Sequence, residues 1–94
     1  MVINVKFIGA LRGMSGRSRL SIHVRKTTPL REIIKKITEE LPQIARAIVD
    51  PELEDPRPNT LILINGKEIS VLDGLDTMLK DGDEVVLVPV IHGG

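Results

Sequence analysis

The sequence predicts an α+β fold in which a mixed sheet carries one main helix on one face. Two segments near the start alternate apolar and polar residues with the period of half-buried strands. One later stretch repeats apolar residues at helical spacing. An Asn-Gly pair then separates two short strand-like runs, and the last such run is apolar on both faces. Together these patterns indicate strand, strand, helix, strand, short strand and strand.

The first two strands are predicted to form a hairpin. Residues 3–7 alternate Ile, Val and Phe with Asn and Lys, and residues 19–25 alternate Leu, Ile and Val with Arg, Ser and His. Between them, "GALRGMSGR" is rich in glycine and polar side chains. We therefore expect a long loop between two antiparallel strands.

The main helix is predicted within "TTPLREIIKKITEEL", with Thr28 as its N-cap and Pro29 at its first position. One stripe of this helix holds Leu30, Ile33, Ile34, Ile37 and Leu41. Pro42 either ends the helix or starts a second short one over "QIARAIV". A helix of this length is long enough to connect strands by a crossover.

The remaining chain is predicted to complete the sheet. Residues 50–59 hold three prolines and four acids and form a loop. "TLILI" is a strand, Asn-Gly is the turn, and "KEISVL" is the returning strand. Within the turn-rich segment that follows, Leu75 and Leu79 are expected to contact the core. Because "VVLVPVI" is apolar on both faces, it either lies in the middle of the sheet or carries a partner surface on its outer face. We expect it to pair with the first strand at the sheet centre.

Composition limits the kind of protein. The 94 residues are 41% hydrophobic, which fits one small domain with its own core. The absence of cysteine excludes disulfides, a thiol nucleophile and a cysteine-ligated metal. Phe7 is the sole aromatic residue, so the protein has almost no aromatic side chain that could stack on nucleobases. We therefore expect no direct nucleic-acid partner. No signal peptide or membrane-spanning run is apparent, so a cytoplasmic protein is expected.

The charge is zero overall and unevenly distributed. Residues 1–47 carry ten Lys and Arg against three Asp and Glu, whereas residues 48–94 carry three against ten. Such asymmetry indicates docking faces of opposite sign, unless the two halves interleave in the folded sheet. The sequence leaves both possibilities open.

Residues before the C-terminal segment show no pattern typical of a phosphate site or a metal site. The glycine-rich loop lacks a following Gly-Lys-Ser/Thr, so we expect no phosphate site there. His23 lies on the polar face of a strand without a second ligand at metal-binding spacing, and the acids of 50–55 lack the pattern of a calcium loop. No metal and no bound cofactor are therefore expected.

The segment "VPVIHGG" differs from this background, because an apolar strand leads directly to two glycines. We expect a domain over residues 1–91 and a flexible tail over 92–94, although the role of His92 is not predicted. A terminal carboxylate is ionised at neutral pH, since its pKa is about 3.3–3.7, and it becomes electrophilic once adenylated. Glycine lacks a Cβ and fits the narrow cleft of an activating enzyme.

These residues resemble the ubiquitin-like β-grasp family. The matching pieces are "INVKFIGALR", "LILINGKEI" and "LKDGDEVVLVPVIHGG". The chain is most similar to the sulfur-carrier branch, which includes the molybdopterin synthase small subunit, the thiamine sulfur carrier, the ubiquitin-related modifier and the small archaeal modifiers. Val90 departs from the tail of the molybdopterin synthase subunit, where a second proline is usual, and "His-Gly-Gly" is more like the ubiquitin-related modifier.

The resemblance implies a sulfur carrier rather than an enzyme. Gly94 would be adenylated by an enzyme of the ubiquitin-activating type that uses ATP, and then thiocarboxylated, with Gly93 beside it in the enzyme's cleft. The sulfur would go to molybdopterin, through the synthase large subunit, or to tRNA, through a thiolating enzyme. Two alternatives remain: a modifier joined through Gly94 to lysines of target proteins, and a β-grasp binding module with an inert terminus.

The same resemblance implies that the outer face of the sheet binds these partners. Strand alternation turns Ile62, Val85 and Leu87 toward the helix. The predicted partner-binding residues on the other face and beyond the strand are Leu61, Leu63, Val86, Val88, Pro89 and Ile91.

Overall fold

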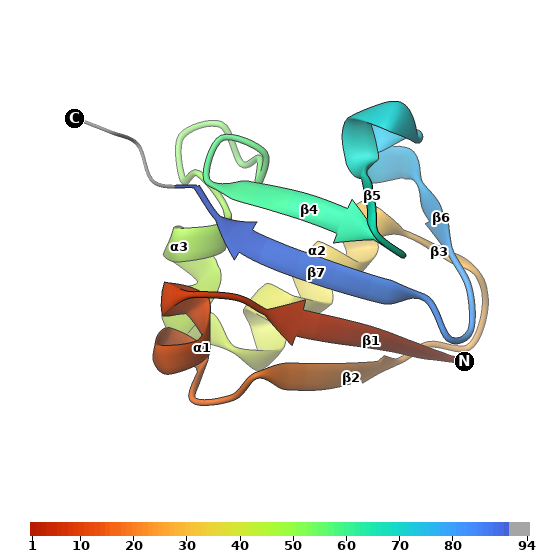
Figure 1. Cartoon of the computed structure of the whole chain (residues 1–94), viewed down its shortest axis with the longest axis horizontal. Coiled ribbons are helices and arrows are strands. Elements are labelled where there is room, and N and C mark those ends of the chain that lie inside the picture. The colour runs from red at the N-terminus through yellow and green to blue at the C-terminus, as the bar shows by residue number, and fades with distance from the viewer. Residues whose placement is uncertain (91–94) are drawn as a thin grey trace.

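The computed structural model describes residues 1–90 as a five-stranded mixed sheet with helices on one face. The strand order is β2-β1-β7-β4-β5 (Figure 1). Its strands are β1 (Val2–Phe7), β2 (Arg19–His23), β4 (Thr60–Ile64), β5 (Lys67–Glu68) and β7 (Glu84–Pro89). β1 and β7 are parallel, and the other neighbours are antiparallel. The prediction that the last strand lies at the centre beside the first is confirmed.

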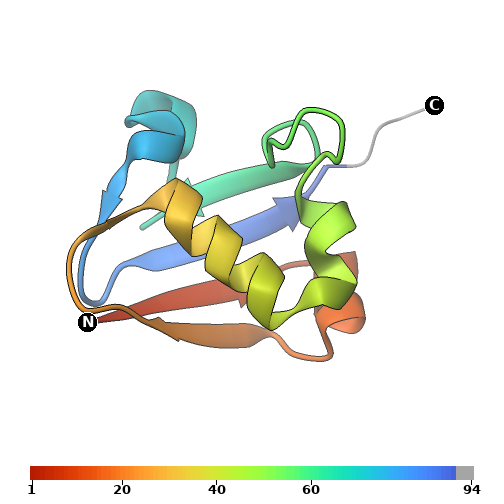
Figure 2. The ribbon, with the colours of Figure 1, turned by 180° about the vertical axis from the view of Figure 1, so that it is seen from behind.

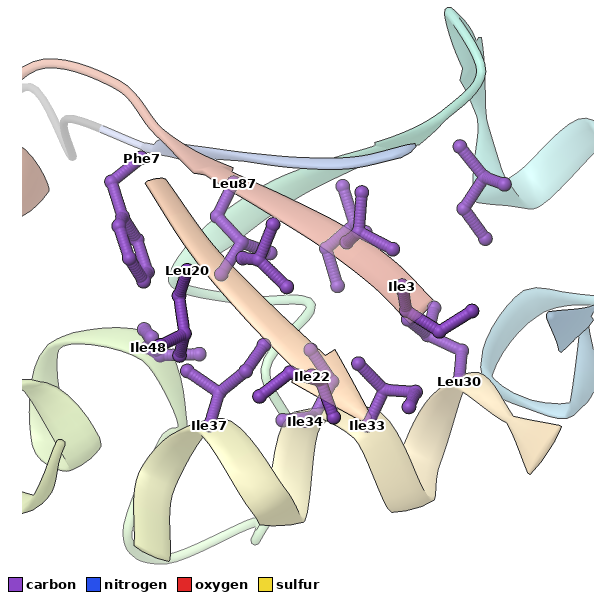
Figure 3. Close-up of a cluster of buried hydrophobic side chains, with 14 of the residues drawn as sticks. Ile3, Phe7, Leu20, Ile22, Leu30, Ile33, Ile34, Ile37, Ile48 and Leu87 are labelled. Atoms are coloured by element: carbon purple, nitrogen blue, oxygen red, sulfur yellow. The ribbon is translucent and has the colours of Figure 1, made fainter. Parts of the chain in front are cut away.

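Helix α2 (Leu30–Glu40) crosses one face of this sheet (Figure 2). The predicted stripe is buried, and its isoleucines contact side chains from the strands (Figure 3). A 3-10 helix, η1 (Pro42–Ile44), and helix α3 (Ala45–Ile48) continue from it and bury one isoleucine each. The second short helix expected after Pro42 is therefore present, and the core lies between the sheet and these helices.

The predicted N-cap is wrong. Thr28 Oγ1 donates to the Lys26 carbonyl oxygen at 2.7 Å and makes no capping bond, and Pro29 occupies the N-cap position. Residues Thr28–Pro29 instead form strand β3, which pairs with β6 (Met78–Leu79) in a separate two-stranded sheet. This pairing holds the chain extended, so α2 begins after the proline.

The loop predicted between the first two strands contains a helix, α1 (Ala10–Ser15). The hairpin itself is confirmed. Leu11 is buried in the core, and Gly16 ends the helix with a left-handed φ of 75°, its N–H donating to the Arg12 carbonyl. The helix forms because one buried leucine and one C-terminal glycine suffice to place a single turn and a half against the sheet.

The region after β4 also differs from the prediction. Asn65 and Gly66 form the expected turn, with φ values of 50° and 85°. The returning strand β5 is two residues long, and two 3-10 helices follow: η2 (Ile69–Val71) and η3 (Gly74–Asp76). Leu79 is buried and Leu75 contacts the core, as predicted. No helix within residues 1–90 is long and apolar enough to cross a membrane.

Candidate docking face and C-terminal strand

The outer face of the sheet carries an apolar strip along β4 and β7. Leu61 pairs with Val88 and Leu63 pairs with Val86 across the antiparallel ladder, so the four side chains are neighbours. Leu61 is 40% exposed, and the other three are half-buried. The predicted orientation of these residues is confirmed, since the intervening Ile62, Val85 and Leu87 are buried against the helix layer. We call these four residues the outer strip.

Charged residues border the outer strip on both sides. Lys6 of β1 is the parallel partner of Val86, and Glu68 of β5 pairs with Leu63. Lys6 lies between two buried residues of its strand and so points outward. An apolar centre between charged flanks has the composition of a protein-binding surface.

The motif Asp81-Gly82-Asp83 fixes where β7 begins. Asp81 Oδ1 accepts the Val2 N–H at 2.7 Å, and the Gly82 N–H donates to the Val2 carbonyl oxygen at 2.9 Å. The φ of Gly82 is 85°, a conformation that glycine adopts without strain. The motif therefore joins the start of β7 to the start of β1.

Asp83 connects the same corner of the sheet, where β7 begins, to strand β4. This carboxylate is 6% exposed and accepts the Lys80 N–H at 2.8 Å and the Asn65 side-chain amide at 3.0 Å. Burial alone would raise the pKa of Asp83, but these hydrogen bonds and the Lys80 charge outweigh it, so the pKa is lowered. Asn65 Oδ1 in turn accepts the Glu84 N–H at 2.9 Å. The register between β4 and β7, and hence the outward orientation of the outer strip, rests on this corner.

The other end of β7 is held by fewer contacts. Pro89 lies against Gly9, where a Cβ would come 3.5 Å from the proline Cγ. Gly9 has φ 60° and ψ −135°, which favours glycine. The Val90 N–H donates to the Asn59 carbonyl oxygen at 2.9 Å. This hydrogen bond continues the contact with the chain before β4 one residue beyond the end of β7, because Pro89 lacks only its own donor.

Ile91, His92, Gly93 and Gly94 lie outside the described residues, so the predictions for them stay predictions. Sequence reasoning missed the role of Gly9, although a glycine two residues after the first strand was a possible signal. Among residues 1–90, no three His, Cys, Asp or Glu side chains are grouped to hold a metal ion. His23 is exposed on the edge strand β2, as its position on the polar face predicted.

Comparison with known proteins identifies the family. The family model described as "ThiS family" matches residues 5–94. This chain belongs to the ThiS family.

Relatives in this family include both modifiers and sulfur carriers. Small archaeal modifier protein 3 of Haloferax volcanii is 30% identical over 95 residues, covering 100% of both chains. A putative sulfur carrier protein of Archaeoglobus fulgidus is 40% identical over 37 residues, which are 39% of this chain and 42% of the relative. The solution structure of small archaeal modifier protein 1 from Methanosarcina acetivorans has a TM-score of 0.85 at 28% identity, covering 99% of this chain and 96% of the other.

The fold of this ThiS-family chain is therefore the ubiquitin-like β-grasp, as the resemblance implied. Proteins of this family are sulfur carriers and modifiers rather than catalysts. Two solved complexes contain a chain of this fold beside a second protein.

Proposed function

We propose that this protein is a sulfur carrier whose Gly94 is adenylated and then converted to a thiocarboxylate. The observation that carries the proposal is the placement of β7. This strand is bonded on both sides in the sheet centre, contributes Val86 and Val88 to the outer strip, and ends five residues before Gly94. Membership of the ThiS family supports the same assignment.

The proposed reaction has two steps: adenylation activates the Gly94 carboxylate, and sulfur then displaces AMP. A carboxylate oxygen of Gly94 attacks the α-phosphorus of ATP, and pyrophosphate leaves. Hydrosulfide, or a donor equivalent to it, then attacks the acyl carbon, and the C–O bond to AMP breaks. The product is a thiocarboxylate, in which sulfur replaces one carboxylate oxygen. ATP is bound by the activating enzyme, so this chain needs no cofactor of its own.

The outer strip supplies the binding energy that positions Gly94. Hydrogen bonds hold the chain as far as Val90. Four further residues span at most about 14 Å when extended, at about 3.5 Å each. The active site of a partner docked on the outer strip must therefore lie within that distance of Val90. We propose the same strip for the adenylating enzyme and for the acceptor enzyme, either a molybdopterin synthase large subunit or a tRNA-thiolating enzyme.

The proposal is tested by ATP–pyrophosphate exchange with the adenylating enzyme of the same organism. The chain is expected to support exchange, and a variant lacking Gly94 is expected to lose it. Gly13→Ala serves as a matched control, because its Cβ meets nothing within 4 Å. Exchange at the wild-type rate without Gly94 would show that this residue is not the site of activation.

A second function, conjugation to proteins, is favoured by one observation. The relative that matches the whole chain at 30% identity is named a modifier. In that case a lysine amine attacks the adenylated or thioester-linked Gly94 carbonyl and gives an isopeptide. Trypsin digestion of whole-cell lysate would then release target lysines that carry residues 81–94 of this chain, because Lys80 is its last tryptic site, and these remnants would vanish when the gene is deleted. Remnants at unchanged sites after deletion would exclude this chain as their source.

A further inference from the structure

The free edge of the sheet at β2 is a second surface able to take a partner. Within residues 1–90, β1 is the sole strand paired with β2. The Val24 N–H donates to the Met1 carbonyl at 2.9 Å, so even-numbered residues of this strand face β1. In an antiparallel ladder the intervening residues turn their backbone groups the other way. The N–H and C=O groups of Arg19, Ser21 and His23 therefore face outward along the edge.

A groove with a volume of about 360 Å³ lies beside this edge, between β2 and α2. Figure 2 shows the C-terminal end of α2 beside β2. Ile22 gives the groove an apolar floor, since its side chain points inward and is still 7% exposed. The full lining is Ser21, Ile22, His23, Lys36, Glu39 and Glu40.

The edge carries positive charge that the fold does not neutralise. Residues 1–31 contain seven Lys and Arg and no Asp or Glu. Four of these cations lie on β2 or directly flank it, and all are exposed: Arg17, Arg19, Arg25 and Lys26. None of the four takes part in an ion pair within the described part of the chain. The charge asymmetry of the sequence is thus expressed at one edge of the sheet.

We infer that the β2 edge receives an extended acidic segment of a partner protein, which adds a strand to the sheet. The outward N–H and C=O groups of β2 bond to its backbone. Residues directly opposite each other share a face, so acidic side chains of the added strand lie opposite Arg19 and His23. Alternate residues point into the groove over Ile22. There, Glu39 and Glu40 favour short apolar side chains over acids.

Other occupants fit this edge less well. Two copies joined through β2 would bring their arginines close together, and like charges on facing strands are destabilising. Single-stranded nucleic acid needs aromatic platforms, and Phe7, the sole aromatic residue, is fully buried. An acidic peptide can pair with the exposed cations of this edge, and its backbone can also bond to the outward N–H and C=O groups of β2.

The inference is tested by NMR titration of the whole 94-residue protein with the capped peptide Glu-Val-Glu-Val-Glu-Val-Glu. We expect the largest amide shifts at Arg19, Ser21 and His23, with smaller ones at Lys36. A peptide with lysine in place of glutamate is expected not to bind. Shifts centred on the outer strip, equal binding of the lysine peptide, or no binding would overturn the inference.

A separate control tests whether the peptide pairs with the backbone of β2. Two peptides, N-methylated at alternate sets of residues, block opposite edges of the added strand. One of them is expected to lose binding and the other to keep it, because a strand bonds to β2 through one edge. Equal binding of both, or displacement of the acidic peptide by single-stranded RNA, would show that attraction is purely electrostatic and overturn strand addition.

Charge variants complete the test. Arg19→Glu is expected to weaken peptide binding about fivefold, the upper range for one exposed charge pair. Lys67→Glu, the same charge change on the opposite edge strand β5, is expected to leave binding unchanged. A chain lacking Gly93 and Gly94 is expected to bind as well as the full chain. The sulfur-carrier proposal and this inference can therefore fail separately.

Discussion

The two faces of β4 and β7 are built from the same kinds of side chain and have opposite roles. Ile62, Val85 and Leu87 are at most 1% exposed, whereas Leu61 on the other face is 40% exposed. Each fully buried aliphatic side chain contributes about 1.5–3 kcal/mol to folding. The outer strip leaves much of that apolar surface in water, where a partner can cover it. Alternation along a strand, rather than residue type, separates the face that forms the core from the face that we propose for docking.

The largest expected effect comes from breaking the inner face. Leu87→Ala removes a fully buried side chain from the central strand and is expected to lower the free energy of unfolding by about 2–5 kcal/mol. Val86→Ala, one residue earlier on the outer strip, is expected to cost less than about 1 kcal/mol because its site is open to solvent. Chemical denaturation followed by circular dichroism measures both. Equal losses would contradict the division between the two faces.

The second prediction concerns a substitution on the outer face and its effect on partner binding. Val88→Asp places a charge in the middle of the outer strip and is expected to weaken binding to the activating enzyme at least about 30-fold, the effect of a hot spot worth about 2 kcal/mol. The unfolding free energy is expected to fall less than in Leu87→Ala, because Val88 is half-buried rather than fully buried. Surface plasmon resonance measures the affinity. Unaltered binding would place the docking surface elsewhere.

A third prediction concerns the corner that holds the end of β7 next to β1. Gly9→Ala is expected to destabilise the protein by about 1–3 kcal/mol, because the backbone there has positive φ. Gly13→Ala is the matched control; it lies within α1 at ordinary φ and is expected to be neutral or slightly stabilising. Thermal unfolding distinguishes them. A Gly9→Ala protein as stable as the control would mean that this corner accommodates alanine without strain.

A fourth prediction concerns pH and the corner where β7 begins. The lowered pKa of Asp83 means that the folded state favours its ionised form. Its contribution to stability is therefore complete above the unfolded value of about 3.9, and it is lost as the pH falls through the lower folded value. Asp83→Asn is expected to cost about 1–3 kcal/mol at neutral pH and to flatten the acid-induced loss. Unfolding curves between about pH 2 and 7 would show whether the slope is unchanged, which would contradict this assignment.

Patterns with strict periods were predictable from the sequence. The alternation of apolar and polar residues in β1 and β2 and the stripe of α2 each bury one face, so residue order alone identified these parts of the core. Asn65-Gly66 was predictable because few residues adopt positive φ at both turn positions.

Features that depend on distant contacts were not predictable. Thr28 had the side chain of an N-cap, but pairing between β3 and β6, about 50 residues apart, took it into a strand. Helix α1 rests on one buried leucine, which is too little for a periodic signal. The contact between Gly9 and Pro89 joins the two ends of the sequence, and no local pattern reveals it.

The central claim is that Gly94 carries sulfur, and the intact mass of the protein isolated from its own cells tests it most directly. We predict a fraction of molecules in which one terminal oxygen is replaced by sulfur, and the loss of that fraction in a variant lacking Gly94. A spectrum containing only the free acid, with no lysines carrying residues 81–94 in a tryptic digest of the same lysate, would contradict the proposed function and favour a binding module with an inert terminus.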